Sequence, residues 1–250
     1  MIKVVFVDLD HTLLNNHGEL SLKNFEAIRK YKNIVKIIIA TARPSRDTRF
    51  LYDVLGLDTP IINYNGGLVH NYCTCYSTTY LDPIRVKEIL ENLPTYENLW
   101  IESANGPLMK RWDDDTLKWS RCGNVVPKLI KEISEVDFNL LHKILVSSSS
   151  DNNLLNALKN RLNKWLEILP DRINKAYGAE IVLKELRFSW EESMAIGDDE
   201  NDIELLSLVK LPVAMPNAIG KVRKLSSLVV PSNGGNGVAE ALEIVLGGKK

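Results

Sequence analysis

Two short apolar runs near the start of the chain restrict its fold more than any other feature. Residues 2–7 and 34–40 are rich in Val and Ile and contain few polar side chains. Continuous runs of this kind are typical of strands buried on both faces, as in a parallel sheet. The segment from Ser21 to Tyr31 separates the runs and has the spacing of an amphipathic helix that Ser21 would cap. The chain therefore opens as a strand, a helix and a second strand.

The same alternation returns in the last third of the chain. Residues 194–196 predict a short strand, 203–209 a helix and 238–245 a closing helix. Strands that alternate with helices predict a doubly wound α/β fold, with a parallel sheet and right-handed crossovers. After a strand at residues 60–62, the turn Asn65-Gly66-Gly67 predicts a hairpin.

The middle of the chain has a different character. Strands are predicted at 99–103 and 143–147, and helices at 82–92 and 151–163. We interpret residues 81–170 as a separate α+β insert, and residues 1–80 plus 171–250 as the core. Four of the five tryptophans fall in the insert. Those at 112 and 119 flank three aspartates and could face a ligand, but packing of the insert with a solvated acidic loop is the favoured interpretation.

Charge and composition limit the classes of partner. The 250 residues are 45% hydrophobic and 25% charged, with a net charge of −1. No basic field indicates nucleic acid or an anionic membrane, and no apolar run is long enough to span a bilayer. The short first run is no secretory signal, so we expect a cytoplasmic protein with a small-molecule partner, monomeric or homodimeric.

Three cysteines, at 73, 75 and 122, do not indicate a disulfide framework, because their number is odd. A soft-metal site that also uses His70 is the alternative. Two thiols at this spacing without a second matched pair favour plain loop or strand thiols instead.

Two carboxylates stand at the end of the first predicted strand. Asp8 and Asp10 are two residues apart, so the period of a strand points both the same way. The carboxyl ends of parallel strands line the ligand crevice of such a sheet. Adjacent acids repel each other unless a cation lies between them or one of them is protonated, and Mg²⁺ prefers oxygen ligands. The alternative at this point is an ordinary turn, in which Asp is common.

A second acidic group, Gly197-Asp198-Asp199-Glu200-Asn201-Asp202, follows the strand predicted at 194–196. A helix that begins there would bring Asp198 and Asp202 to one side. Acids favour helix N-termini in general, but that preference does not account for five polar residues directly after a buried strand. The ligand pattern of a Ca²⁺ loop is missing.

Two further polar groups would complete a phosphate site. Thr41 and Arg43 follow the second strand and offer a hydroxyl and backbone amides to a phosphate, although Arg43-Pro44 is also a plain turn sequence. Lys175 is one lysine among many, and composition alone favours a solvated surface charge. Neither signal is specific by itself.

In their order along the chain, these stretches resemble the motifs of the haloacid dehalogenase superfamily, in its Cof-type branch of subfamily IIB phosphatases with a large α/β cap. The family's Asp-x-Asp-Gly-Thr-Leu-Leu is similar to residues 8–14, and its Thr-Gly-Arg to Thr41-Ala42-Arg43. Its lysine and acidic motifs resemble Ile173-Asn174-Lys175 and residues 197–202. The match covers both flanks of the chain, whereas the cap is matched only by position and size.

The resemblance implies a Rossmann-like core and a Mg²⁺-dependent phosphatase that acts on small phosphate monoesters, such as a sugar phosphate or a phosphoglycolate-like compound. Asp8 would be the nucleophile that forms an aspartyl-phosphate, and Asp10 the general acid and base. The residues implied for binding phosphate are Thr41, Ala42, Lys175 and Asn201. Those implied for the metal are Asp8, Asp10 through its backbone carbonyl, Asp198 and Asp202. Asp202 is favoured as a partner of the metal's ligands or of Lys175.

Three residues depart from the family pattern. His11, Ala42 and Ala176 each replace a glycine. Each adds a side chain near the expected phosphate pocket, which narrows it or requires a different backbone angle. No reacting group is removed.

Two other functions fit the same residues. One is a sugar phosphomutase or phosphotransferase of the same superfamily, and the other is a non-hydrolytic phospho-acceptor regulatory protein of the receiver type. A dinucleotide-binding protein is not expected, because the first strand is not followed by a G-x-G-x-x-G turn.

Overall fold

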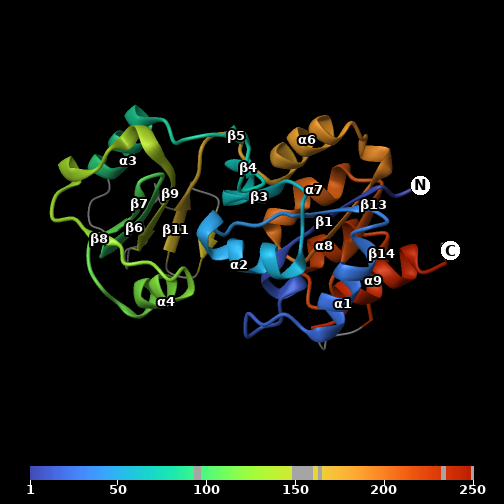
Figure 1. Cartoon of the computed structure of the whole chain (residues 1–250). Helices are drawn as coiled ribbons and strands as arrows, with labels where there is room; N and C mark the ends of the chain where they lie inside the picture. The colour runs from blue at the N-terminus through green and yellow to red at the C-terminus, as the bar shows by residue number, and fades with distance from the viewer. Residues whose placement is uncertain (93–96, 148–159, 163–164, 232–234, 249–250) are drawn as a thin grey trace. The chain divides into compact units, whose positions relative to one another are not determined.

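The structure is a computed structural model that describes residues 1–92, 97–147, 160–162, 165–231 and 235–248. The chain divides into two compact units. The first consists of Met1–Thr78 together with Ile173–Lys250, and the second consists of Thr79–Arg172. We describe each unit by itself (Figure 1).

The described part of the first unit is built on a five-stranded parallel sheet in the order β14-β13-β12-β1-β2. The strands are β1 (Val4–Val7), β2 (Lys36–Ile39), β12 (Ser193–Gly197), β13 (Leu211–Ala214) and β14 (Leu228–Val229). All four residues of β1 are buried, as the apolar run predicts. The α/β class predicted from the alternating pattern is confirmed.

Helices cover both faces of this sheet, as the core contacts show. Val5 and Val7 of β1 lie in the core on one face, and Val4 and Phe6 lie in the core on the other. The first face packs against α1 (Leu22–Tyr31), α2 (Ser45–Leu55) and α9 (Gly237–Leu246). The second packs against α6 (Lys175–Leu186), α7 (Ile203–Leu208) and α8 (Gly220–Leu225).

A small antiparallel sheet follows the second helix of this unit. Its strands are β3 (Ile61–Asn63), β4 (Leu68–His70) and β5 (Cys75–Thr78). An isolated bridge between Ala40 and Ile62 connects β3 to the end of β2. The predicted hairpin is present, and a short 3₁₀ turn, Tyr64–Gly66, connects β3 to β4.

The second unit contains a six-stranded sheet in the order β10-β11-β9-β6-β7-β8, counted over its described residues. The pairs are antiparallel except β7 with β8. The strands are β6 (Asn98–Ser103), β7 (Gly106–Met109), β8 (Lys128–Leu129), β9 (Leu141–Ser147), β10 (Asn160–Leu162) and β11 (Trp165–Ile168). Its helices are α3 (Pro83–Asn92) and α4 (Asp114–Cys122).

Two sequence expectations for the second unit need correction. Most of the helix predicted at 151–163 lies outside the described residues, but residues 160–162 form strand β10. The three aspartates after Trp112 are not a solvated loop: Asp113 caps α4, and the indole Nε1 of Trp165 donates to Asp115 at 2.8 Å. Packing is confirmed for Trp119, which contacts the rings of two other tryptophans.

Five further short turns lie outside these elements, besides the Tyr64–Gly66 turn already named. The first unit contains η1 (Leu9–Leu13), η5 (Trp190–Glu192) and η6 (Glu200–Asp202), and the second contains η3 (Ile133–Glu135) and η4 (Phe138–Leu140). Across the described residues, none of the helices has the length and apolarity that a bilayer crossing requires.

Candidate active site

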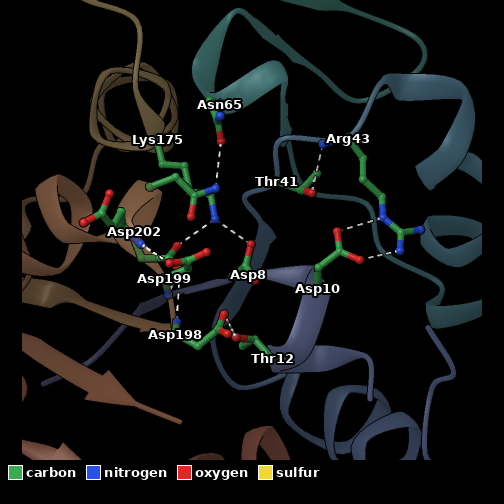
Figure 2. A network of polar contacts seen from close by, with 12 residues as sticks. Asp8, Asp10, Thr12, Thr41, Arg43, Asn65, Lys175, Asp198, Asp199 and Asp202 are labelled. Atoms are coloured by element: carbon green, nitrogen blue, oxygen red, sulfur yellow. Dashed lines mark hydrogen bonds and ion pairs between the residues drawn. The ribbon is translucent and has the colours of Figure 1, made fainter. Parts of the chain in front are cut away.

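Parallel pairing of β1 with β12 brings the two acidic groups of the sequence together. Val7 pairs with Ile196, and the amide of Asp8 donates to the Ile196 carbonyl at 3.0 Å. Asp8 and Asp198 therefore leave neighbouring strands at the same edge of the sheet. Both side chains are buried (Figure 2).

Lys175 lies between two of these carboxylates. It is the first residue of α6, whose N-terminus is capped by the side chain of Asn174. Its Nζ donates to Asp8 Oδ1 at 2.5 Å and to Asp202 Oδ1 at 2.6 Å, and its side chain is fully buried. A buried ammonium needs such partners. The plain surface lysine that composition favours is thus not what the structure contains.

Asp202 uses both of its carboxylate oxygens within the protein. Oδ1 accepts from Lys175, and Oδ2 accepts from the amides of Asp198 and Asp199 at 3.0 and 3.3 Å. Gly197 leaves no room for a Cβ against the Asp202 side chain. Asp202 therefore holds Lys175 and the start of the acidic turn in place.

The group carries more negative than positive charge. Ligand atoms of Asp8, Asp198 and Asp202 lie within 4.8 Å of one another, beside the single ammonium of Lys175. Burial raises the pKa of Asp8 well above its usual value, against the effect of Lys175. Burial, with Asp202, raises the pKa of Asp198 to about 6. Hard oxygen ligands with surplus negative charge fit a divalent cation such as Mg²⁺.

The charge of Lys175 is favoured in turn. Burial alone would lower its pKa, but the carboxylates of Asp202 and Asp8 outweigh burial and raise it. The lysine is therefore a fixed positive charge within the group rather than a proton donor.

Two neutral side chains hold the carboxylate of Asp198. Thr12 Oγ1 donates to its Oδ1 at 3.0 Å, and Asn217 Nδ2 donates to its Oδ2 at 3.1 Å. Asn217 also donates to the carbonyl of His11 at 3.2 Å. Thr12 lies in the segment that resembles the first family motif, but sequence analysis assigned neither Thr12 nor Asn217 to the site.

Asp10 does not point toward the acidic group. Its carboxylate accepts two hydrogen bonds from Arg43, from Nε at 2.9 Å and from Nη2 at 2.5 Å. Burial raises the pKa of Asp10, but the guanidinium outweighs burial and the net pKa lies below its usual value. The sequence placed Arg43 in the phosphate motif and missed its pairing with Asp10.

Thr41 and Asn201, both predicted to bind phosphate, lie beside the turn between β3 and β4. Thr41 is buried, and its Oγ1 accepts from the amide of Arg43 at 3.1 Å. Asn201 Nδ2 donates to Asn65 Oδ1 at 3.1 Å. Ala42 lies between Thr41 and Arg43 and is half-buried. Sequence analysis missed Asn65 because the Asn-Gly-Gly turn accounted for it.

Only one of the three replaced glycines has an unusual backbone. His11 has a φ of 61°, in the left-handed region that favours glycine. Ala42 and Ala176 do not have a positive φ, and Ala176 lies in the first turn of α6. The doubt about backbone angle therefore applies to His11 alone.

The soft-metal alternative has no counterpart in the described chain. All three cysteines are free and exposed. His70 uses both ring nitrogens, one with Asn63 and one with the amide of Tyr72. Among the described residues, the carboxylates around Lys175 form the group that could hold a metal ion.

Comparison with known proteins shows the family to which the chain belongs. A family model described as haloacid dehalogenase-like hydrolase matches residues 5–242. A 5-amino-6-(5-phospho-D-ribitylamino)uracil phosphatase of Bacillus subtilis is 25% identical, over 96% of this chain and 96% of its own. A phosphoglycolate phosphatase of Archaeoglobus fulgidus is 26% identical, over 97% and 96%.

A solved structure extends the likeness to the fold. The haloacid dehalogenase-like hydrolase from Bacteroides thetaiotaomicron superposes with a TM-score of 0.86 at 23% identity, covering 98% of this chain and 100% of that chain. The chain belongs to the haloacid dehalogenase-like hydrolases, as a Cof-type member. It is accordingly a phosphoric monoester hydrolase.

Proposed function

We propose that the protein hydrolyses a small phosphate monoester, a sugar phosphate or a phosphoglycolate-like compound, through an aspartyl-phosphate on Asp8. The observation that carries the proposal is the buried group at one sheet edge, where Lys175 Nζ lies 2.5 Å from Asp8 and 2.6 Å from Asp202. A carboxylate nucleophile beside a fixed positive charge is the arrangement that phosphoryl transfer requires.

Asp8 acts as the nucleophile in the first step. One of its carboxylate oxygens forms a bond to phosphorus while the bond from phosphorus to the ester oxygen breaks. Asp10 gives its proton to the departing oxygen, which leaves as an alcohol. In the second step a water attacks phosphorus, Asp10 takes the proton of that water, and phosphate and the Asp8 carboxylate are released.

The paired state of Asp10 fits the second step. Arg43 holds both carboxylate oxygens and favours the ionised form, which is the form that a general base needs. For the first step Asp10 must carry a proton, so its bidentate contact with Arg43 has to open before the leaving group is protonated.

Three side chains would bind the transferring phosphoryl group. Lys175 supplies positive charge, Thr41 a hydroxyl and Asn201 an amide N–H, with the backbone amide of Ala42 beside them. All come from segments that follow or face the carboxyl ends of β2 and β12. They would stabilise the charge that spreads over the equatorial oxygens.

Mg²⁺ would be held by Asp8, Asp198 and the backbone carbonyl of Asp10. When bound, it would neutralise negative charge between the nucleophile and the phosphate. Asp202 would act through Lys175 and through the amides it accepts from, rather than as a ligand. Thr12 and Asn217 would fix the orientation of the Asp198 carboxylate.

The second unit, Thr79–Arg172, would select the leaving group. We also expect the protein to act in the cytoplasm. The names of the two relatives support a small substrate of this kind. The first is named as a phosphatase of a phosphorylated ribityl compound and the second as a phosphatase of phosphoglycolate. They also indicate that substrates diverge at this level of identity, so the leaving group has to be found by assay.

The experiment is phosphate release from a panel of sugar phosphates, phosphoglycolate and p-nitrophenyl phosphate, in MgCl₂ and in EDTA. We expect phosphate release that requires Mg²⁺. A ³²P-labelled ester should also label the protein, and hydroxylamine should remove that label. The Asp8→Asn variant should not become labelled. Phosphoryl transfer to a sugar with little free phosphate would replace hydrolysis by a mutase reaction. A stable label without turnover would replace it by a regulatory role.

A further inference from the structure

The turn between β3 and β4 has a rare backbone conformation. Tyr64, Asn65 and Gly66 have φ values of 51°, 54° and 104°, three successive residues in the region that favours glycine. For a bulky L-residue such as Tyr64 this conformation is costly. Such conformations persist where the surrounding structure determines them, and they cluster at functional sites.

The main chain of this turn is joined to the segment that follows β2. The amide of Asn65 donates to the carbonyl of Thr41 at 3.0 Å, and the amide of Tyr64 donates to the carbonyl of Arg43 at 3.2 Å. The side chain of Asn63 donates to the same Arg43 carbonyl at 3.0 Å. The turn thereby fixes the position of the motif that carries Thr41 and Arg43.

A buried histidine fixes the orientation of the Asn63 amide. The amide of Tyr72 donates to His70 Nδ1 at 3.1 Å, so the hydrogen of the neutral ring is on Nε2. Nε2 then donates to Asn63 Oδ1 at 2.9 Å, which leaves Asn63 Nδ2 as the donor to Arg43. Each of these three linked hydrogen bonds therefore has one possible direction.

On its other side the turn lies against the helix that carries Lys175. A Cβ on Gly66 would collide with the carbonyl of Asn174, and one on Gly178 would come within 3.1 Å of the Gly66 Cα. Asn174 is the N-cap of α6. The glycine is therefore required for the close approach of the turn to the start of α6.

The side chain of Asn65 connects this turn to the acidic motif. Asn65, labelled in Figure 2, is 4% exposed. Its Oδ1 accepts from Asn201 Nδ2 at 3.1 Å. An amide nitrogen has two hydrogens, so this bond sets the direction of the second one. The left-handed backbone at position 65 is what directs the side chain toward Asn201 from a turn already joined to Thr41.

We propose that Asn65 is a positioning residue of the phosphate site, which acts by orienting the amide of Asn201. This inference rests on the proposed function, because it takes Asn201 as a phosphate ligand. The turn sequence Asn65-Gly66 is then required by the site as well as by the hairpin: asparagine tolerates the left-handed backbone and supplies the acceptor, and glycine permits the approach to α6.

The test is a double-mutant cycle on the binding of inorganic phosphate, measured by ³¹P NMR titration in MgCl₂ so that no turnover is needed. The variants are Asn65→Gly, Asn201→Ala and the double variant. Glycine keeps the left-handed backbone and removes only the side chain. Asn124→Gly is the matched control, since Asn124 has a φ of 45° and is an exposed residue of the second unit.

We expect Asn65→Gly to weaken phosphate binding roughly fivefold, the usual effect of one hydrogen bond. In the Asn201→Ala background the same substitution has no further effect, because the residue it orients is gone. Asn124→Gly leaves the affinity unchanged. Asn65→Ala weakens binding as much as Asn65→Gly but unfolds at a lower temperature, since alanine is strained at this φ.

Three results would overturn the inference. Equal losses from Asn65→Gly in both backgrounds would show that Asn65 does not act through Asn201. An unchanged affinity, or an Asn65→Gly protein that does not fold, would make its role purely structural. A wild-type protein that binds no phosphate and hydrolyses no ester would remove the proposed function itself, whereas a failed cycle in a phosphate-binding protein would remove only this inference.

Discussion

Both units bury a lysine beside carboxylates, but in different ways. In the second unit Lys143 and Glu167 form an ion pair at 2.9 Å on adjacent strands, and Lys143 is also the register partner of Glu102. In the first unit Lys175 lies among three carboxylates from two segments far apart in the sequence, Asp8 in one and Asp198 with Asp202 in the other. Cross-strand pairing accounts for the first arrangement, whereas nothing about sheet formation requires the second.

The difference is one of charge balance. Asp8 and Asp198 both have raised pKa values, so ionising them opposes folding. A fold that needed only a stable core would not gather these groups, and their surplus negative charge suits a site that could bind a cation. The predictions below test whether the first group serves function and the second serves stability.

The largest effect is expected for Asp8→Asn. Phosphatase activity should fall by at least about 10³-fold, because an amide cannot form the covalent phosphoryl intermediate. The unfolding free energy without metal should not fall, since the substitution removes one of three crowded acids and leaves Lys175 paired with Asp202. Activity assays and urea unfolding measure the two effects. A less stable variant would mean that Asp8 serves the fold as well.

Metal binding should depend steeply on pH below about 6. Because the pKa of Asp198 is raised to about 6, the folded protein binds the extra proton between about pH 4 and 6. Stability without metal therefore falls as pH rises through that window, and below about pH 6 Mg²⁺ must displace the Asp198 proton. We expect the Mg²⁺ Kd, from calorimetry, to weaken by up to about tenfold per pH unit below 6.

The control for this prediction is a neighbouring acid. Asp198→Asn should abolish the rise in thermal midpoint that MgCl₂ gives the wild-type protein. Glu200→Gln should keep it, because Glu200 is exposed and pairs with Lys221 at the surface. An equal loss in both variants would mean that general acidity, rather than the buried group, holds the cation.

Sequence reasoning reached the fold of the first unit and the types of residue in its site, but not the contacts between them. The apolar runs could be assigned to strands because burial on both faces leaves a continuous pattern. The pairing of Asp10 with Arg43 leaves no such trace, since it depends on the rotamers of two side chains 33 residues apart. Sequence analysis missed Asn65 because the hairpin turn alone accounts for the dipeptide Asn65-Gly66.

Each unit contains a buried histidine that should make the folded protein more stable at neutral pH than in acid. Burial, with Arg49, lowers the pKa of His70 to about 4, and burial lowers that of His142. The unfolded chain binds more protons below pH 6.5, so stability is lost as pH falls toward 4, by up to about 3 kcal/mol for His70. Hydrogen exchange at pH 7 and pH 5, read for peptides of each unit, measures the loss.

The controls for this prediction are glutamine variants. His70→Gln should reduce the pH dependence of exchange in the first unit, and His142→Gln that in the second. If His70→Gln left the slope of the first unit unchanged, His70 would not be the group that titrates.

Glu167→Gln should destabilise the second unit by about 2 kcal/mol. Both side chains of the pair are nearly buried, at 10% and 13% exposed, so the loss of one charge weakens the pairing of an ammonium that is largely removed from water. Tryptophan fluorescence during urea unfolding reports on this unit, which holds four of the five tryptophans. Mg²⁺ affinity should be unchanged, in contrast to Asp198→Asn.

The smallest effects concern the three positions where glycine is replaced. Only His11 has a left-handed backbone, so His11→Gly should raise the unfolding free energy by about 0.5 kcal/mol, after the loss of its surface hydrogen bond with Asn16. Ala176→Gly should lower it by about 1 kcal/mol, because Ala176 is a buried helical residue. Thermal unfolding of the two variants gives the sign of each change.

Opposite signs would show that the family's glycine at position 11 meets a backbone requirement, whereas alanine at position 176 suits the helix that presents Lys175. A gain from both would mean that side-chain crowding near the phosphate site, rather than backbone angle, sets the cost.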